Sequence, residues 1–587
     1  MITRLFDIVA RRAERAPQSV MLAAKEAGTW RSYTTAEVWD SAQRLASGLQ
    51  RLGISAETKD VAAQEKIILI SPNRPEWIIT DLGVQMAGAV LTPIYPTVAP
   101  QDLGFILRDA GVRIVILADD AMHKRFAAVI AETPGVEHVF SFEEVAGTKP
   151  WKSLMTDGGG QVKTDHLTGD TLATIIYTSG TTGTPKGVML THNNVVSNVV
   201  DCMPIFSFAM AGSKALSFLP LNHIFERVVS YVYLNADLSI WYAESMETIG
   251  DNLREVQPLV FTTVPRLLEK VYERILAKGM ELTGAKRALF FWALDLAKKY
   301  DNVKSPGVFY DMQLALANKL IFSKWRAALG GNVKAIVSGS AALQERLIRI
   351  FSAAGIVIME GYGLTETSPV ITVNRFESKD RRIGCVGPLI PNVEVKLCED
   401  GEIITRGPNV MAGYYQQPQM TAEVMKDGWF HTGDIGKWVE GRFLKITDRK
   451  KEIFKTSGGK YVAPQPIENK MRESPYIEQI MVVGAGQKFA GALIVPSYAQ
   501  LRKWLQDAGK DVPQSNAAIA ALPEVRDLIR KQIDKYNAFF GHVEQVKKFA
   551  LLTQEWTVDT GALTPSLKMK RKAIETAHAK EIADLYD

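Results

Sequence analysis

The sequence predicts a multidomain α/β protein, and three observations support this fold class. The 587 residues exceed what one hydrophobic core usually organises, so at least two domains are expected. Short apolar runs alternate with stretches of helical spacing through the first half, which is typical of layered sheets with largely parallel strands. After about residue 375 the pattern becomes β-rich, and from about residue 450 a further compact mixture of strands and helices follows.

The first half supplies the expected strands and helices of the layered sheets. Buried strands are predicted at 66–71, 112–118, 171–178, 214–219, 333–339 and 356–360. Helical spacing follows two of them, at 75–89 and 120–132. Because ligands of open α/β sheets bind at the carboxyl ends of strands, residues directly after these strands are candidates for a site.

The predicted organisation has two parts. Residues 1–450 form a large N-terminal domain of layered α/β sheets, with a β-rich subdomain at about 375–450. Residues 451–587 form a small α+β C-terminal domain, with strands expected at 477–485 and 491–497. The boundary is placed where the β-rich pattern ends.

Composition excludes several classes of protein. The chain is 47% hydrophobic and 23% charged, which is a globular balance. Its formal net charge of +5 with no long basic arm gives no support for nucleic-acid binding. Only three cysteines occur, without a CxxC pair, which argues against a disulfide scaffold or a thiolate zinc site. We expect a cytoplasmic protein without a transmembrane segment, and peripheral contact with a membrane stays open.

The strongest motif is YTSGTTGTPKG, residues 177–187, which follows the predicted strand at 171–178. It combines backbone freedom, donors and one positive charge, all suited to a phosphate group. The residues concerned are Thr178, Ser179, Gly180, Thr181, Thr182, Gly183, Lys186 and Gly187. The spacing is not that of a Walker A loop. The alternative is a glycine- and threonine-rich surface turn.

This string resembles the phosphate loop of the adenylate-forming (AMP-binding) superfamily, which includes acyl-CoA synthetases, luciferases and peptide-synthetase adenylation domains. Further motifs of the superfamily follow in order, and the resemblance extends from about residue 20 to 572. It implies that ATP and Mg²⁺ are used to activate a carboxylic acid. It also implies that the C-terminal domain is mobile and joined by a hinge at Lys451.

EGYGLTETSP, residues 360–369, resembles the adenine-side motif of the superfamily. The resemblance assigns nucleotide contacts to Glu360, Gly361, Tyr362, Gly363, Leu364 and Thr365. Tyr362 would stack on the base, Thr365 would contact the α-phosphate, and Glu366 would bind Mg²⁺ with Thr178 as second protein ligand. Taken alone, Glu366 is more typical of a solvated loop carboxylate.

Three shorter segments gain their meaning from the same resemblance. Gly339, Ser340 and Ala341 would border adenine and the acyl group, although small residues also serve helix–sheet packing. His223 would position the substrate carboxylate and stabilise charge, whereas a lone histidine is usually structural. Asp434 would accept hydrogen bonds from both ribose hydroxyls, and the alternative is a turn aspartate.

The C-terminal motifs supply charged residues. In residues 446–464, Arg449 would reach ribose or phosphate, and Lys455 with the turn Ser457, Gly458 and Gly459 matches the face used for thioester formation. This turn is one residue longer than the commonest short-loop version, so the resemblance does not fix the exact CoA contacts. Lys568 matches the adenylation lysine. Without the resemblance, these lysines would be read as a solvated face and a basic tail.

The long segment 271–330 and the motifs around His223 and Lys455 resemble the long-chain fatty acyl-CoA synthetases more than the acetate or coumarate enzymes. The expected reaction makes acyl-AMP and pyrophosphate from fatty acid and ATP, and then acyl-CoA and AMP with CoA as co-substrate. The aromatic run at 286–300 is more typical of core than of an acyl tunnel or membrane surface. Alternatives are a fatty acyl-AMP ligase that loads a carrier-protein thiol, a luciferase-like oxygenase, and a non-catalytic acyl-adenylate or lipid-binding protein.

Overall fold

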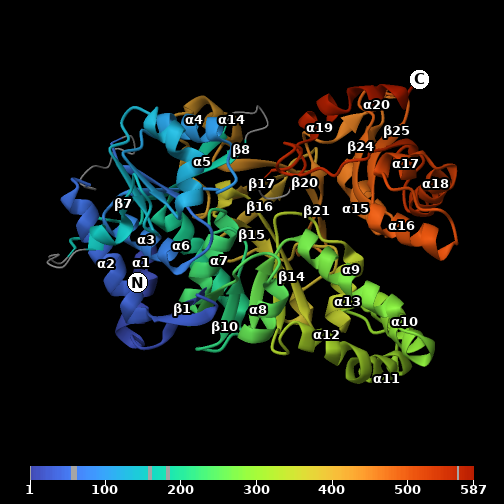
Figure 1. Cartoon of the computed structure of the whole chain (residues 1–587), viewed down its shortest axis with the longest axis horizontal. Helices are drawn as coiled ribbons and strands as arrows, with labels where there is room; N and C mark the ends of the chain where they lie inside the picture. The colour runs from blue at the N-terminus through green and yellow to red at the C-terminus, as the bar shows by residue number, and fades with distance from the viewer. Residues whose placement is uncertain (1, 55–62, 156–161, 180–184, 565–567) are drawn as a thin grey trace. The chain divides into compact units, whose positions relative to one another are not determined.

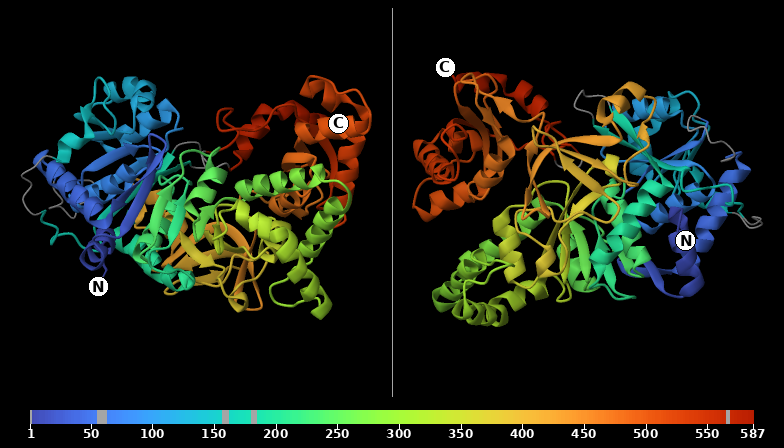
Figure 2. Two further views of the ribbon diagram at one scale, coloured as in Figure 1. Left: turned by 60° about the horizontal axis from the view of Figure 1, so that its bottom comes forward. Right: turned by 180° about the vertical axis from the view of Figure 1, so that it is seen from behind.

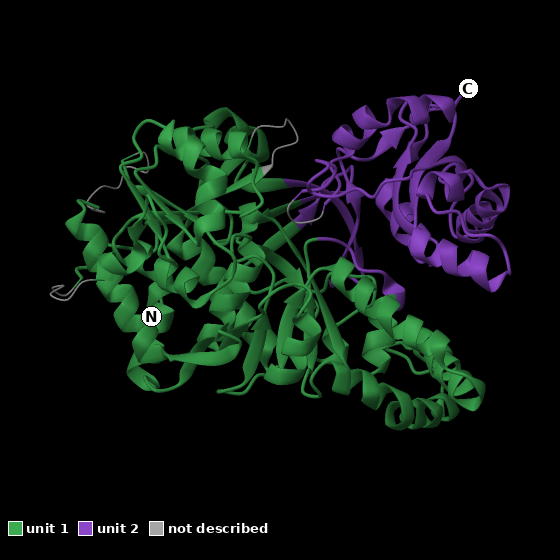
Figure 3. Ribbon diagram, in the orientation of Figure 1, with its two compact units in different colours: residues 1–340, 347–395, 404–431 green, residues 341–346, 396–403, 432–587 purple. Residues whose placement is uncertain are grey.

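The computed structural model describes residues 2–54, 63–155, 162–179, 185–564 and 568–587. It divides the chain into two compact units (Figure 3). Unit 1 comprises 1–340, 347–395 and 404–431, and unit 2 comprises 341–346, 396–403 and 432–587. Each unit is described by itself below.

The first of two eight-stranded sheets in unit 1 has the order β18-β9-β8-β4-β3-β5-β6-β7. Figure 1 labels β7 and β8 of this sheet. Its strands are β3 Lys66–Ile70, β4 Val90–Ile94, β5 Ile114–Leu117, β6 His138–Ser141, β7 Lys149–Pro150, β8 Leu172–Ser179, β9 Pro185–Thr191 and β18 Gly413–Tyr414. All neighbours from β8 to β7 pair in parallel, whereas β9 pairs antiparallel with both β8 and β18. The expected strands at 66–71, 112–118 and 171–178 are confirmed, and β9 is an addition that the sequence patterns did not indicate.

The second sheet has the order β15-β14-β13-β12-β10-β11-β1-β2. Its strands are β1 Val20–Glu26, β2 Thr29–Thr34, β10 Lys214–Ser217, β11 Ser239–Tyr242, β12 Val260–Thr263, β13 Ala335–Ser338, β14 Val357–Gly363 and β15 Val370–Val373. The strands from β14 to β1 pair in parallel, and an antiparallel strand lies at each edge. The strands expected near 214, 333 and 356 are therefore confirmed.

A shared core joins the two sheets of unit 1. One buried cluster contains Ile67 and Leu91 from the first sheet together with Ala215 and Ile240 from the second. The first seven helices are α1 Leu5–Arg15, α2 Thr35–Arg51, α3 Pro75–Met86, α4 Pro100–Ala110, α5 Asp120–Ala131, α6 His192–Cys202 and α7 Ile224–Asn235. Helices α3 and α7 are buried along nearly their whole length, which explains why α3 carries apolar residues around its whole circumference.

Helix α8, Ile249–Val256, precedes strand β12, and residues 265–328 after that strand form a helical region that projects from the second sheet in both views of Figure 2. The helices of this region are α9 Pro265–Glu281, α10 Gly284–Lys298, α11 Val308–Ala317 and α12 Ser323–Ala328. A short π-helix, Asn318–Phe322, joins the last two. The ring of Phe290 on α10 packs near Trp325, with 6.1 Å between centroids. Part of the aromatic run at 286–300 therefore belongs to a core.

A five-stranded sheet, ordered β16-β17-β20-β19 with β21 on β20, contributes residues to both units. Its strands are β16 Glu394–Leu397, β17 Glu402–Arg406, β19 Met425–Lys426, β20 Trp429–Val439 and β21 Phe443–Arg449. Further along unit 2, a three-stranded sheet of β24 Ile477–Val483, β25 Ala490–Pro496 and β26 Val546–Leu551 packs with helices α15 Pro464–Met471 and α18 Pro523–Asn537 around a buried apolar cluster. The predicted mixed α/β class is confirmed. Within the described ranges, no helix has both the length and the apolar character needed to cross a bilayer.

Candidate functional site

Strands β8 and β9 carry the two ends of the glycine–threonine motif. They pair so that Thr178 lies opposite Lys186 and Tyr177 lies opposite Gly187. A Cβ atom at Gly187 would lie 2.8 Å from a methyl group of Ile175, so the close packing here requires glycine. The middle of the predicted phosphate loop lies outside the described residues: Gly180, Thr181, Thr182 and Gly183. Ser179 is the last residue of β8.

The two charged residues of the predicted phosphate and metal contacts meet in the structure. The Lys186 ammonium donates to Oε1 of Glu366 at 2.8 Å, although the residues are 180 positions apart. It also donates to the hydroxyl of Tyr414 at 2.6 Å, and this hydroxyl donates to the same carboxylate oxygen at 2.8 Å. Tyr414 was not among the expected site residues, because nothing in its local sequence marks it.

Electrostatics keep the Glu366 carboxylate ionised. Burial alone would raise its pKa, but the charge and hydrogen bond of Lys186 and the Tyr414 hydroxyl outweigh burial, so the pKa of Glu366 is lowered. Burial also raises the pKa of Tyr414, and the negative charge of Glu366 adds to this, so the phenol stays protonated and can donate. Glu366 is therefore a fixed negative charge in a buried position.

The residues present fit a magnesium ion. Thr178 lies opposite Lys186 across the ladder, and Lys186 contacts Glu366. The Thr178 hydroxyl oxygen is buried and, within the part of the chain that the structure describes, has no hydrogen-bond partner. Buried polar atoms normally have a partner, so this oxygen is available to a ligand. A hydroxyl and a carboxylate are the hard oxygen donors that Mg²⁺ prefers.

The adenine-side motif begins inside a strand. Residues Glu360, Gly361, Tyr362 and Gly363 end β14, and Thr365 begins a 3₁₀ turn, Thr365–Thr367, that contains Glu366. A Cβ atom at Gly363 would lie 1.7 Å from the Pro369 carbonyl oxygen, so only glycine allows this chain reversal. The turn is fixed further by the Leu364 N–H, which donates to the Thr367 hydroxyl at 3.0 Å.

The three small residues Gly339, Ser340 and Ala341 directly follow strand β13. Ser340 adopts a left-handed backbone conformation with φ of 70°, which is uncommon outside glycine. A Cβ atom at Gly339 would come within 3.1 Å of the Phe225 ring, so a larger residue would crowd this contact. Ala341 begins the first segment of unit 2. The segment is therefore a strained strand end, as functional turns often are.

His223 caps helix α7. Its Nδ1 accepts a hydrogen bond from the Phe225 N–H at 3.2 Å, and it precedes the first helical residue, Ile224. This bond uses one ring nitrogen and fixes the orientation of the imidazole. The structure thus gives His223 a structural role as a helix cap, and its expected role toward a substrate carboxylate stays a prediction.

Within unit 2, the two residues expected at ribose are joined. Asp434 on β20 lies opposite Arg449 on β21, and the guanidinium Nε lies 3.2 Å from the carboxylate. Asp434 is buried, whereas the Arg449 side chain is 44% exposed, so the arginine can also reach a ligand. The backbone N–H of Asp434 donates to the Thr432 hydroxyl at 3.1 Å, which holds the aspartate in place.

Lys451 and Lys455 lie close together in sequence at the start of the expected C-terminal domain. Lys451 is exposed in a turn directly after β21. Lys455 ends the short strand β22, Phe454–Lys455, and its ammonium lies 5.5 Å from the centre of the Tyr461 ring. Ser457, Gly458 and Gly459 form an exposed turn, in which Gly459 has a φ of 78° that favours glycine.

Lys568 directly follows residues 565–567, which the structure does not describe, and precedes helix α19, Arg571–Ala577. Its backbone N–H donates to the Thr564 hydroxyl at 3.0 Å, and its carbonyl accepts from the Thr564 N–H at 2.8 Å. Three residues later, the Arg571 guanidinium donates to both carboxylate oxygens of Glu468 on α15. This bidentate pair fixes the chain beside Lys568 to the body of unit 2.

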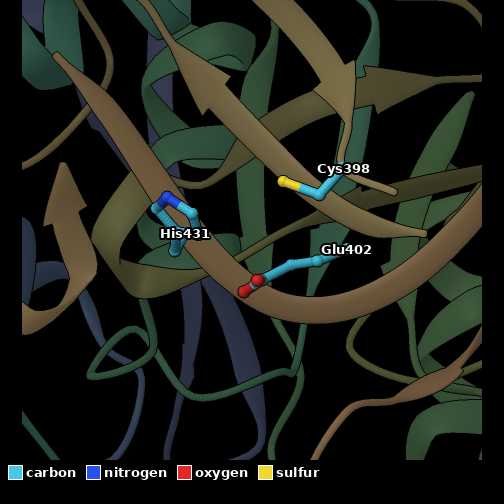
Figure 4. Close-up of side chains that lie close together, drawn as sticks. All are labelled: Cys398, Glu402 and His431. Atoms are coloured by element: carbon cyan, nitrogen blue, oxygen red, sulfur yellow. The ribbon is translucent and has the colours of Figure 1, made fainter. Parts of the chain in front are cut away.

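Figure 4 shows the side chains of Cys398, Glu402 and His431. Both carboxylate oxygens of Glu402 already accept hydrogen bonds, one from the Lys450 ammonium at 2.8 Å and one from the Gly433 N–H at 3.1 Å. Burial and the charge of Glu402 raise the pKa of the Cys398 thiol, which disfavours the thiolate that a metal requires. We therefore assign no metal to these residues.

The chain is similar over most of its length to known adenylate-forming enzymes. Residues 9–415 match the family model described as AMP-binding enzyme, and residues 451–587 match the AMP-binding enzyme C-terminal domain. The chain is 34% identical to the long-chain-fatty-acid–CoA ligase FadD15 of Mycobacterium bovis, over 95% of this chain and 93% of the relative. It is 33% identical to human long-chain-fatty-acid–CoA ligase 6, over 96% of this chain and 83% of the relative.

Solved structures share the fold. The adenylation domain of a carboxylate reductase from Mycobacterium chelonae has a TM-score of 0.79 at 19% identity, covering 99% of this chain and 91% of that one. A fatty acyl CoA synthetase from Mycobacterium tuberculosis has a TM-score of 0.65 at 20% identity, covering 98% and 99%. With its strand-anchored lysine ion pair and its two matched family regions, the chain belongs to the AMP-binding enzyme family.

Proposed function

We propose that this protein activates a long-chain fatty acid with ATP and transfers the acyl group to CoA. The observation that carries the proposal is the buried contact of Lys186, Glu366 and Tyr414 beside the strand end at Thr178, in a chain of this family. It places a cation, an ionised carboxylate and a hydroxyl oxygen that has no hydrogen-bond partner among the described residues next to a glycine–threonine motif. Such a set suits a polyphosphate that arrives with Mg²⁺.

The first step joins the acid to AMP. A carboxylate oxygen attacks the α-phosphorus of ATP, the bond to the β-phosphate oxygen breaks, and pyrophosphate leaves. Both reactants are anions, so fixed positive charge and N–H donors are needed where negative charge develops. Lys186 and Lys568 supply the charge, and Thr178 and Glu366 would hold Mg²⁺, which would add further positive charge at the phosphates.

We assign recognition of the base and of the ribose to different sequence regions. Tyr362 and the neighbouring residues of β14 contact the base, and Gly339, Ser340 and Ala341 border it. Asp434 accepts hydrogen bonds from the ribose hydroxyls, and Arg449 reaches ribose or phosphate. The ion pair of Asp434 and Arg449 supports this assignment, because it holds both side chains in one orientation.

The second step forms the thioester. The sulfur of CoA attacks the acyl carbonyl carbon, the bond to the AMP oxygen breaks, and the thiol proton passes to solvent. We assign Lys455 and the turn Ser457–Gly459 to this second step, and Lys568 to the first step. Lys451 is the proposed hinge about which the C-terminal domain rotates between the two steps. The exposure of the Lys455 turn supports a role in meeting a large co-substrate.

The acid is inferred from the relatives. Both relatives are named long-chain-fatty-acid–CoA ligases, and the matches cover 95% and 96% of this chain and 93% and 83% of the relatives. The test is release of AMP, with and without CoA, across saturated fatty acids from short to long chains. We expect CoA-dependent AMP release that is strongest with long chains. Strongest activity with acetate or with an aromatic acid would contradict the substrate assignment.

A second measurement separates the carrier-protein alternative. Direct detection of acyl-CoA by mass spectrometry is expected when ATP, Mg²⁺, fatty acid and CoA are combined. Accumulation of acyl-AMP without acyl-CoA would favour a fatty acyl-AMP ligase. Fatty acid labelled with ¹⁸O in its carboxyl group should transfer label to AMP, and unlabelled AMP would overturn the adenylate mechanism altogether.

A further inference from the structure

Helix α11 and the π-helix after it expose a row of large apolar side chains. This row, here named the α11 stripe, consists of Val308, Phe309, Met312, Leu316 and Leu320. Phe309 is 74% exposed and Met312 is 67% exposed. Most of these side chains are spaced four residues apart, which places them on one face of a helix. The aromatic run at 286–300 was the expected apolar segment, yet the exposed row lies on the next helix along the chain.

The opposite face of the same helix is packed firmly. Tyr310 and Ala317 are buried, and the Tyr310 hydroxyl donates to the Leu296 carbonyl on α10 at 3.0 Å. The Asn318 amide donates to the Ala353 carbonyl at 3.0 Å. Helix α11 is therefore held by one face while its apolar side chains point to solvent. Figures 1 and 2 show α11 at the outer end of the projecting helical region of unit 1.

Positive charge accompanies the stripe. Lys304, Lys319 and Lys324 are exposed and make no ion pair with any carboxylate in the described ranges. The nearby acid Asp311 instead accepts a hydrogen bond from the Ser305 hydroxyl at 2.6 Å. The surface thus combines apolar side chains with three lysines and one exposed carboxylate, Asp311, so its net charge is positive. That combination is typical of helices that lie in the interface of an anionic bilayer.

We propose that the α11 stripe docks on the surface of a membrane that contains anionic phospholipid. Phe309, Met312 and Leu316 enter the boundary between headgroups and acyl chains, and the three lysines contact lipid phosphates. A second copy of the chain is the weaker occupant, because a two-fold interface centred on the stripe would bring Lys319 of each copy toward the other. The inference is independent of the enzymatic proposal, since it uses none of the residues assigned to the reaction.

Vesicle flotation tests the proposal. The native protein should float with vesicles of phosphatidylcholine and phosphatidylglycerol, and much less with phosphatidylcholine alone. The double change Phe309→Glu with Met312→Glu should reduce binding to the mixed vesicles by about tenfold or more, because two large apolar groups no longer enter the bilayer. Met210→Glu is the matched control: Met210 is 69% exposed but lies far along the chain from α11. It should float as the native protein does.

A second pair of changes tests the charge. Lys319→Glu with Lys324→Glu should lower binding to the mixed vesicles and leave the weak binding to phosphatidylcholine unchanged, and added salt should lower native binding. All these positions are exposed, and circular dichroism melting confirms that each variant is folded. Native protein that fails to float with mixed vesicles, or a stripe variant that floats as well as the native protein, overturns the proposal. So does a stripe variant that only changes from dimer to monomer in light scattering.

Discussion

At the scale of single residues, the division of labour between two lysines can be measured. Lys568→Ala removes a positive charge assigned to acyl-AMP formation, and loss of one such fixed group typically costs about 10²–10³ in rate. We expect acyl-AMP formation to fall by that factor, while supplied acyl-AMP is still converted to acyl-CoA. Separate assays of pyrophosphate release and of thioester formation measure the two steps.

Lys572→Ala is the matched control for this experiment. Lys572 is exposed on α19, four residues after Lys568, and has no assigned role. It should leave both half-reactions near native rates. An equal loss of both half-reactions in Lys568→Ala would contradict the assignment.

The Tyr414 hydroxyl is a second residue-scale prediction. It accepts from Lys186 and donates to Glu366, so Tyr414→Phe removes both hydrogen bonds and keeps the ring. Losing a buried hydrogen bond to charged groups costs about 1.5–3 kcal/mol. We expect the Mg²⁺ concentration for half-maximal rate to rise by about tenfold or more, because the orientation of Glu366 is less fixed.

The neighbouring tyrosine provides the control. Tyr415→Phe removes a hydroxyl from the next position, whose ring packs in a separate buried cluster of the first sheet. It should leave the Mg²⁺ dependence unchanged. A Tyr414→Phe variant that lowers the maximal rate without shifting the Mg²⁺ dependence would remove the positioning role and leave only a general effect on the site.

At the scale of elements, helix α7 buries a carboxyl group between strands. Glu226 is fully buried, accepts from the Ser217 hydroxyl on β10 at 2.6 Å, and contacts the Thr262 hydroxyl on β12. Burial raises its pKa from 4.5 to about 7, and these two hydrogen bonds offset burial only in part. In the unfolded chain the pKa returns to its ordinary value, so the native state holds a proton between these pH values that the unfolded state has lost.

This difference in pKa makes stability depend on pH. Because the folded state binds the extra proton, the contribution of Glu226 to stability falls as pH rises through the window from 4.5 to about 7, by about 3 kcal/mol in total. Glu226→Gln removes the titratable group and with it this dependence of stability on pH. In thermal melting from acid to neutral pH, the melting temperature of the variant should rise relative to that of the native protein as the pH increases. Exposed Glu423→Gln should follow the native curve, and a constant difference between Glu226→Gln and native would refute the linkage.

The elements also show what sequence patterns can and cannot predict. The strands at 66–71, 171–178 and 356–360 were predictable because each is a short apolar run whose residues are all buried or nearly so. Strand β9 was not, since its residues 185–191 begin with the Pro-Lys-Gly of the phosphate motif and show no clean alternation. The α11 stripe was missed because exposed apolar residues have the same spacing as core residues in a sequence.

In the candidate site, too, some residues could be predicted from local motifs, whereas the contacts between residues far apart in the sequence could not. Local motifs identified Lys186 and Glu366, but their contact joins positions 180 residues apart, and only the fold brings them together. Tyr414 has no motif of its own and gains its role from strand β18, which pairs with β9. The ion pair of Asp434 and Arg449 likewise follows from the register of β20 and β21.

At the scale of the whole molecule, we assign the two half-reactions to different faces of the C-terminal domain, so the proposed hinge should control one step more than the other. Lys451→Pro fixes φ near −65° and restricts the preceding residue, Lys450, to extended backbone. We expect acyl-AMP formation to persist and conversion of acyl-AMP to acyl-CoA to fall by at least about tenfold. Rapid-quench measurement of each half-reaction separates the two rates.

The matched change Lys451→Ala removes the side chain but keeps the backbone free to rotate. It should retain both half-reactions, which would locate the effect of proline in the backbone rather than in the ammonium group. If Lys451→Pro turned over at the native rate, a rotation at this residue could not be part of the cycle. If Lys451→Ala lost thioester formation as fully as the proline variant, the side chain would be a CoA contact, and the hinge would have to lie elsewhere in the chain.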